Sequence, residues 1–241
     1  MRTIGIIGGL GPQATMDFEA RVHAVSQTLI PQHENQGYPP MLTWYLRHPP
    51  MRCDGIGNHR DLPFEPHPHL LEAAAHLGRL TDFLVIPSNT PHLFLQQIEQ
   101  SAGREVLSMI DLVMREIKRR SAKRIGILAI GFTLQHRLYQ DSLEEAGMSW
   151  ETIEEDMASD LDRAIFNFMQ GKGSSDNSAV AFKAVQSLRK KNVDCIVLGC
   201  TEVPLLLGEQ ILATDLINPV QLLAEAAVKY ALVGSNDAAA F

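Results

Sequence analysis

Two short stretches of this chain are nearly the same, and this duplication most limits how the chain can fold. Residues 82–90 read Asp-Phe-Leu-Val-Ile-Pro-Ser-Asn-Thr, and residues 194–202 read Asp-Cys-Ile-Val-Leu-Gly-Cys-Thr-Glu. Each begins with an acid, runs through apolar residues to a turn former, and ends on a nucleophile, Ser88 or Cys200, with polar residues after it. A short apolar run bounded by turn residues is typical of a buried parallel strand. Open α/β sheets bind ligands just beyond such strands.

A second pair of stretches repeats in the same order. Residues 3–8 read Thr-Ile-Gly-Ile-Ile-Gly, and residues 123–129 read Lys-Arg-Ile-Gly-Ile-Leu-Ala. A duplicated α/β unit with a pseudo-twofold axis is the simplest explanation. We therefore predict the α/β fold class, with two pseudo-symmetric three-layer α/β/α domains, parallel sheets and an active site in the cleft between them. The expected domains are residues 1–104 with 208–241, and residues 105–207.

Helical spacing of apolar residues, with the positions of proline and glycine, predicts the elements between these strands. Helices are expected over residues 13–29, 70–80, 111–120, 134–146, 156–169, 178–191 and 219–232, with another from residue 91. Further strands are expected over residues 41–46, 106–109 and 211–217.

The composition is that of an ordinary globular protein. The chain has 241 residues, of which 45% are hydrophobic and 20% charged, and its net charge of −7 argues against a general nucleic-acid binder. The strand pattern starts at Thr3, which leaves no room for a targeting segment, and no apolar run reaches the ~18 residues of a membrane span. Three cysteines cannot all pair. We expect a cytoplasmic protein with reduced thiols.

The glycine-rich turn at residues 8–12 follows the first expected strand. Glycines there let backbone amides approach an anion at a helix N-terminus. Gly9 and Gly11 match the start of the G-x-G-x-x-G dinucleotide pattern, but Ala14 occupies its last position. The turn is therefore either an anion-binding loop or a tight turn without a ligand. Because neither glycine loop has a complete phosphate signature, a nucleotide-dependent enzyme is disfavoured.

Residues 47–69 are rich in proline and lack periodicity, which is typical of a functional or mobile loop, and we interpret them as a loop over the site. Its four histidines fit no standard zinc spacing, so we interpret them as solvated side chains rather than metal ligands: His48, His59, His67 and His69. Its arginines either form a clamp for a carboxylate or lie in water: Arg47, Arg52 and Arg60.

A thiol and a hydroxyl on opposite sides of one pocket suggest proton transfer to both faces of a carbon atom. To act as a base, Cys200 must reach the thiolate state. We expect the backbone amides of Thr201 and Glu202, at a helix N-terminus, to lower its pKa. The alternative is that Cys200 is a small buried hydrophobe, which is how we interpret Cys195 inside the strand.

Three stretches together resemble the aspartate/glutamate racemase family, and the similarity extends over essentially the whole chain. They are residues 4–15, Ile-Gly-Ile-Ile-Gly-Gly-Leu-Gly-Pro-Gln-Ala-Thr; residues 87–92, Pro-Ser-Asn-Thr-Pro-His; and the most specific, residues 199–204, Gly-Cys-Thr-Glu-Val-Pro. In that family two cysteines on pseudo-symmetric loops racemise a substrate without a cofactor. The resemblance thus implies no cofactor or metal, a small amino-acid or carboxylate substrate, and a homodimer.

The resemblance also implies roles for individual residues. Cys200 and Ser88 stand at the two acid/base positions. Asn89, Thr90 and Thr201 are expected to hold polar groups of the amino acid, and Arg52 matches a position associated with the substrate carboxylate. The full set of expected substrate-binding residues is Leu10, Arg52, Asn89, Thr90, Thr201 and Glu202.

Two positions depart from the family pattern. Ser88 replaces the first cysteine, and a hydroxyl is a far poorer base than a thiolate, so proton removal by Cys200 should outrun removal by Ser88. Ser159 stands where aspartate-type members tend to have a lysine, which weakens charge complementarity to a dicarboxylate. Two alternatives to an aspartate/glutamate-type racemase stay open: an enzyme like the arylmalonate decarboxylases, with a single cysteine, and a catalytically weak small-molecule binder.

Overall fold

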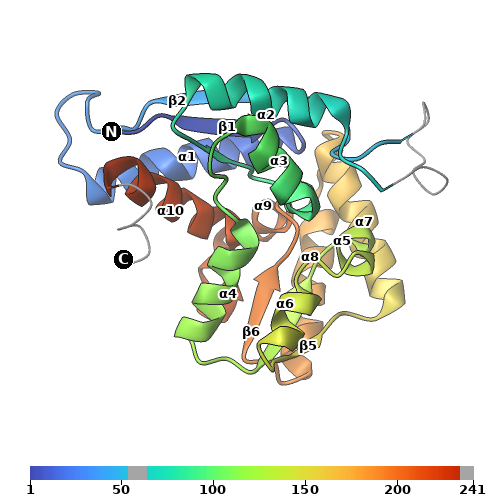
Figure 1. The fold of residues 1–241 in the computed structure, drawn as a ribbon. Helices are drawn as coiled ribbons and strands as arrows, with labels where there is room; N and C mark the ends of the chain where they lie inside the picture. Colours follow the sequence, from blue (N-terminus) through green and yellow to red (C-terminus); the bar gives the residue numbers. More distant parts are fainter. Residues whose placement is uncertain (54–63, 234–241) are drawn as a thin grey trace. The chain divides into compact units, whose positions relative to one another are not determined.

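The computed structural model describes residues 1–53 and 64–233, which form two compact units (Figure 1). The first unit comprises residues 1–109 and the C-terminal segment from Val220, and the second comprises residues 110–219. No helix in the described part of the chain is long and apolar enough to cross a membrane.

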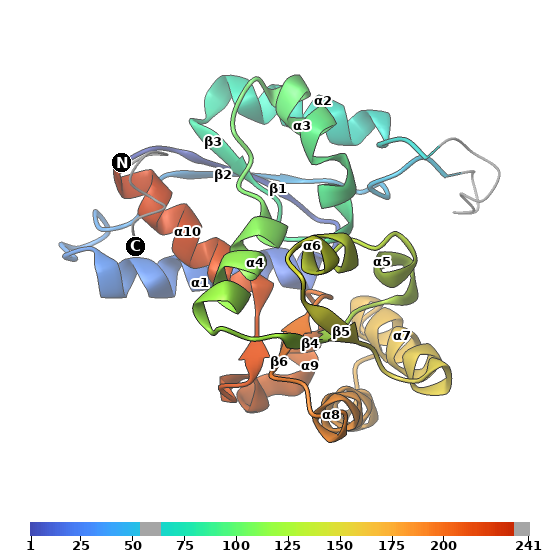
Figure 2. The ribbon, with the colours of Figure 1, turned by 60° about the horizontal axis from the view of Figure 1, so that its bottom comes forward.

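The first unit is built on a three-stranded parallel sheet with the order β2-β1-β3. Figure 2 shows α2 and α3 on one face of this sheet and α1 and α10 on the other. The elements are β1 (Ile4–Gly8), α1 (Pro12–Leu29), β2 (Met41–Tyr45), α2 (Pro68–Leu80), β3 (Phe83–Val85), η1 (Thr90–Phe94), α3 (Leu95–Ala102) and α10 (Pro219–Val233). Strands β1 and β3 are fully buried, as their unbroken apolar runs require.

The second unit is built on a four-stranded parallel sheet with the order β5-β4-β6-β7. Helix α8 packs on β4 and against α7, and Figure 2 shows α4 and α6 on the opposite side of the sheet from α8. The elements are α4 (Met109–Arg119), β4 (Arg124–Leu128), α5 (Gly131–Gln135), α6 (Gln140–Glu145), β5 (Ser149–Glu151), α7 (Glu155–Met169), α8 (Ser175–Lys190), β6 (Cys195–Leu198), α9 (Val203–Leu207), η2 (Gly208–Leu212) and β7 (Leu216–Ile217).

The two sheets have matching strand orders. In each, the Ile-Gly-Ile strand (β1 or β4) lies between an edge strand and the strand that leads to a nucleophile (β3 or β6). In the first unit a single parallel bridge from Leu84 to Val106 occupies the place that β7 takes in the second. The predicted fold class, α/β with two units and parallel sheets, is confirmed.

The aspartate that begins each repeated stretch accepts hydrogen bonds from backbone amides at the start of the neighbouring strand. The backbone N–H of Thr3 donates to Asp82 Oδ2 at 2.7 Å. In the second unit Asp194 Oδ2 accepts two amides, from Lys123 at 2.7 Å and from Arg124 at 2.8 Å. These bonds lie at the start of the strand pairs and support the observed register.

The boundaries of the units and of some elements differ from those expected. The chain divides after residues 109 and 219, whereas the sequence placed the divisions after 104 and 207. Residues 208–219 lie in the second unit because β7 pairs with β6. The strand expected over 106–109 is the single bridge at Val106, and in place of the strand over 211–217 the chain forms η2 followed by the two-residue β7.

The prediction of one helix over residues 134–146 is wrong, because the chain forms two short helices, α5 and α6, in this region. Between them Arg137 adopts a left-handed backbone conformation with φ of 52°, which interrupts the helical hydrogen bonds. Strand β5 was not expected from the sequence. Part of the loop at residues 47–69 is also ordered, since Met51 and Pro66 form an antiparallel bridge, while residues 54–63 lie outside the described part.

Asp194→Asn tests the link between acid and strand. The amides of Arg124 and Lys123 lower the pKa of Asp194, so its stabilising contribution is fully present above the unfolded-state pKa of about 3.9 and is lost as pH falls through the lower folded-state value. We expect Asp194→Asn to lower the free energy of unfolding by at most about 1 kcal/mol at pH 7, because the carboxylate is exposed to solvent.

The measurement is urea unfolding at several pH values. The difference from wild type should narrow below about pH 4. Asp82→Asn, which affects an acid that accepts one amide instead of two, is expected to have the smaller effect. A deficit in Asp194→Asn that stays constant down to pH 2 would contradict this role.

Candidate active site

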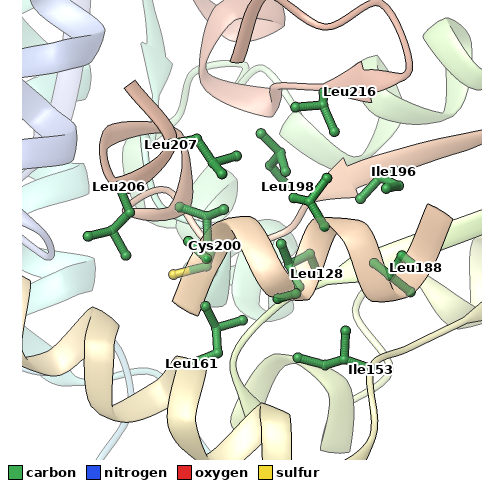
Figure 3. Close-up of a cluster of buried hydrophobic side chains, with 14 of the residues drawn as sticks. Leu128, Ile153, Leu161, Leu188, Ile196, Leu198, Cys200, Leu206, Leu207 and Leu216 are labelled. Carbon is green, nitrogen blue, oxygen red and sulfur yellow. The ribbon is translucent and has the colours of Figure 1, made fainter. Parts of the chain in front are cut away.

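Cys200 follows β6 directly and lies at the edge of the hydrophobic core of the second unit. Its side chain is 6% exposed and belongs to a buried cluster with Leu128, Leu161 and Leu198. Figure 3 shows its sulfur directed away from Leu128 and Leu188. Fully burying each such leucine stabilises a fold by roughly 1.5–3 kcal/mol, so the cluster is a firm support for the thiol.

Gly199 brings the backbone before Cys200 close to the neighbouring strand. A Cβ atom at this position would lie 3.0 Å from the Ala129 Cβ and 3.3 Å from Tyr139 Cε2. A side chain at this position would require Ala129 or Tyr139 to shift by a few tenths of an ångström, and tightly packed interiors accommodate an added methyl group poorly. The turn former in the second repeat therefore sets how Cys200 leaves the sheet.

Two side chains donate hydrogen bonds to the Glu202 carboxylate. The Cys200 thiol donates to Glu202 Oε2 with an Sγ–O distance of 3.2 Å, and the Thr201 hydroxyl donates to the same oxygen at 3.1 Å. All three residues are buried, each 5–6% exposed. The thiol thus has a proton acceptor within direct reach.

The expectation that the turn lowers the pKa of Cys200 is wrong. Burial and then the charge of the Glu202 carboxylate raise it well above its usual value, and Asp162 adds to the effect. The backbone amide of Glu202 acts in the expected, lowering direction but is outweighed. Burial also raises the pKa of Glu202 itself, against its hydrogen bonds from Cys200 and Thr201. The resting site therefore favours a protonated thiol.

Two residues that sequence reasoning missed complete the surroundings of Cys200. Tyr139 is fully buried beside it, and burial together with the charge of Cys200 raises the pKa of the phenol. Asp162 on α7 is partly buried, and its Oδ2 accepts a hydrogen bond from the Gly131 amide at 3.3 Å. Neither position belongs to a repeated motif, so no sequence signal could have found it.

Ser88 lies beyond β3 in the first unit and is partly buried. Its carbonyl oxygen accepts a hydrogen bond from His92 Nδ1 at 2.9 Å, and the Met109 amide donates to His92 Nε2 at 3.1 Å. Because an amide N–H only donates, Nε2 must accept and Nδ1 must carry the proton. His92 thereby holds the backbone of Ser88, a role that sequence reasoning missed although the residue lies in the quoted 87–92 stretch.

The glycine-rich turn before α1 is closed by Thr15. The Gly9 amide donates to the Thr15 hydroxyl at 2.9 Å, and that hydroxyl donates to the Gly11 carbonyl at 3.1 Å. Gly9 has a φ of 81°, and a Cβ atom there would lie 2.6 Å from the Leu46 carbonyl oxygen, so the position requires glycine. Leu10, at the tip of this turn, is partly buried.

The expected substrate-binding residues other than Leu10 fall into three places. Thr201 and Glu202 adjoin Cys200 in the second unit. Asn89, buried, and Thr90, partly buried, follow Ser88 in the first unit. Arg52 is exposed, and its Nε lies 3.4 Å from Glu65 Oε2 across the bridged segment.

Three of the four loop histidines form a group. The ring of His48 stacks on that of His67, with centroids 4.9 Å apart, and lies 4.2 Å from the ring of His69. Burial lowers the pKa of His67, and the other two histidines add to this. Within residues 1–53 and 64–233, no group of three or more His, Cys, Asp or Glu side chains is arranged to hold a metal ion. His59 and Arg60 lie outside the described residues.

Comparison with known proteins identifies the family of this chain. A family model described as Asp/Glu/Hydantoin racemase matches residues 7–227. The chain belongs to this racemase family. The broad specificity amino-acid racemase RacX of Bacillus subtilis (strain 168) is 23% identical to it over 201 residues, which cover 83% of this chain and 85% of RacX.

Solved structures of the racemase family share the fold. An aspartate racemase from Picrophilus torridus matches with a TM-score of 0.75 at 20% identity, over 99% of this chain and 98% of that one. An aspartate racemase homologue from Pyrococcus horikoshii OT3 matches with a TM-score of 0.73 at 22% identity, over 96% and 100%. The two-unit architecture described above is therefore that of the family.

Glu202→Gln tests the contact between thiol and carboxylate. The substitution removes the negative charge that raises the Cys200 pKa, so alkylation of Cys200 should begin at lower pH than in wild type. The measurement is the rate of iodoacetamide labelling as a function of pH, read for each cysteine by peptide mass spectrometry.

Cys195 serves as an internal control for this experiment. Burial raises its pKa to about 11, and its labelling profile should not change in Glu202→Gln. An unchanged Cys200 profile, or one shifted to higher pH, would show that Glu202 does not act on the thiol.

Proposed function

We propose that this chain is a cofactor-independent amino-acid racemase of the aspartate/glutamate type, with Cys200 as a proton-transfer group at Cα. One observation carries the proposal: the buried Cys200 thiol donates a hydrogen bond to the buried carboxylate of Glu202. Membership of the Asp/Glu/Hydantoin racemase family and similarity to a relative named as a broad specificity amino-acid racemase support an amino acid as substrate.

In the proposed mechanism the Glu202 carboxylate takes the thiol proton, and the Cys200 thiolate removes the α-proton of the substrate. The electron pair of the broken C–H bond moves onto the α-carboxylate, which gives an enediolate. Burial raises the proton affinity of both Cys200 and Glu202, so each is a stronger base than in water. A positioned base of this kind contributes roughly 10²–10⁴ in rate.

We assign the second proton transfer to Ser88. Its hydroxyl delivers a proton to the opposite face of the enediolate, and a new C–H bond forms. The alkoxide regains a proton from solvent water, and Glu202 returns the proton that it took from the thiol to solvent, which restores the starting state. The backbone of Ser88 is held by the neutral His92 ring, which favours a fixed position for the hydroxyl. Because a hydroxyl is a poor base, Ser88 removes the α-proton of one enantiomer more slowly than Cys200 removes that of the other.

The remaining assignments belong to the same proposal. Thr201, whose hydroxyl donates to Glu202, orients that carboxylate, and Arg52 supplies a guanidinium for the α-carboxylate once it leaves the exposed contact with Glu65. Leu10, Asn89 and Thr90 line the substrate. A homodimer and a cytoplasmic location stay predictions.

Cys200→Ala tests the proposal directly. Single enantiomers of a panel of acidic, neutral and basic amino acids are incubated with the protein, and the appearance of the opposite enantiomer is followed by chiral chromatography. Wild type should invert at least one of them, and Cys200→Ala should lose at least about 100-fold in rate because the proton-transfer group is gone.

Cys195→Ala is the matched control. Cys195 is also a buried cysteine of the same segment, but it lies inside β6 and should be replaceable with less than about a threefold change in rate. Equal losses in the two variants, or no inversion of any amino acid by wild type, would contradict the proposed function.

A further inference from the structure

Two acidic side chains act on Cys200. The charges of Glu202 and Asp162 both raise the pKa of the thiol. Glu202 already accepts hydrogen bonds from Cys200 and Thr201. A substrate with a second carboxylate in its side chain would bring another negative charge to this surface, where repulsion opposes binding.

Asp162 has one carboxylate oxygen that is not used by the protein. Its Oδ2 accepts the Gly131 amide, whereas Oδ1 is buried and has no hydrogen-bond partner in residues 1–53 and 64–233. Buried polar atoms are almost always paired, and an unpaired charged acceptor is the most costly kind. The arrangement therefore lacks a donor. Asp162 follows Leu161, which packs in the same buried cluster as Cys200, and it holds the amide of Gly131, two residues after the Ala129 that faces Gly199. This neighbourhood makes a bound substrate the natural source of the donor.

The helix that carries Asp162 is firmly held. Leu161 and Ile165, on α7, are buried in the same cluster as Cys200, and α7 packs along α8. Asp162 is consequently positioned by the core rather than by a surface loop. A side chain on such a rigid element can impose specificity on a ligand.

The neighbouring residues on α7 offer no positive charge to a dicarboxylate. Ser159, one turn before Asp162, uses its hydroxyl to donate to the Glu155 carbonyl at 3.1 Å. Arg163, which directly follows Asp162, is exposed and paired with Asp160 at 2.6 Å. On this stretch of the helix the one arginine is therefore already paired with an acid.

We propose that Asp162 receives the cationic side-chain group of the substrate, so that the preferred substrates are basic amino acids rather than aspartate or glutamate. This inference rests on the proposed racemase function and specifies its substrate class. The ammonium or guanidinium group of the substrate donates to the buried Oδ1 of Asp162. A charge-assisted hydrogen bond of this kind is roughly twice as strong as a neutral one and selects strongly against an anion.

The experiment compares substrates of matched size. Exchange of the α-proton in D₂O is measured by proton NMR for lysine, for norleucine, which has a side chain of similar length without the charge, and for glutamate. The proteins are wild type, Asp162→Asn and Asp160→Asn. Asp162→Asn keeps an acceptor for the Gly131 amide, and Asp160→Asn removes an exposed acid from the same helix.

In wild type we expect kcat/KM for lysine to exceed that for glutamate by at least about 100-fold. Asp162→Asn should lower kcat/KM for lysine by about 10- to 100-fold, chiefly through KM, while norleucine changes less than about threefold. Asp160→Asn should leave all three substrates within about threefold of wild type. Circular dichroism spectra and thermal unfolding of the variants report on folding.

If Asp162→Asn does not fold, Asp162→Glu, which retains the charge, replaces it, and the lysine preference must then persist. Equal losses for lysine and norleucine would show that Asp162 binds the α-ammonium group or only supports the chain near Gly131, and would overturn the inference. Cys200-dependent exchange that is fastest with glutamate would overturn it while leaving the racemase function standing. No exchange with any amino acid would refute the proposed function, and the inference with it.

Discussion

The position of each nucleophile depends on an aspartate at the opposite end of its strand. Asp82 and Asp194 accept hydrogen bonds from the first backbone amides of the neighbouring Ile-Gly-Ile strand. Once paired strands are held in register at one end, the residue that leaves the sheet at the other end is determined. Ser88 and Cys200 each lie six positions after the corresponding aspartate. Both copies of the repeat therefore keep the same spacing along the strand between the aspartate and the nucleophile.

The two copies share this geometry but provide different chemistry. Cys200 is buried beside carboxylates, whose negative charge favours the protonated thiol. Ser88 is only partly buried, and its backbone rests on a neutral histidine. In the proposed mechanism, groups this unequal transfer protons at unequal rates. The inferred preference for basic substrates would link reactivity to specificity, because a cation bound at Asp162 offsets part of the negative charge that raises the thiol pKa.

The sequence could predict the strands and their nucleophiles, because short apolar runs and turn residues are local signals. The sequence could not predict which groups the acids contact or in which direction they shift the Cys200 pKa. The partner of Asp194 depends on which strands pair, and the burial of Glu202 depends on the core that forms around it, so the expected lowering of the Cys200 pKa had the wrong sign. Asp162 reaches the site from a helix distant in sequence. The break at Arg137 was hidden because the apolar spacing continues across it.

The central claim is that solvent protons enter Cα through Cys200. Single enantiomers incubated in D₂O with wild type and with Cys200→Ala, followed by proton NMR for deuterium at Cα and by chiral analysis for inversion, test it most directly. We predict that one enantiomer exchanges faster than it inverts, because Ser88 closes the cycle slowly, and that both processes vanish in Cys200→Ala. Exchange at an undiminished rate in Cys200→Ala would contradict the claim.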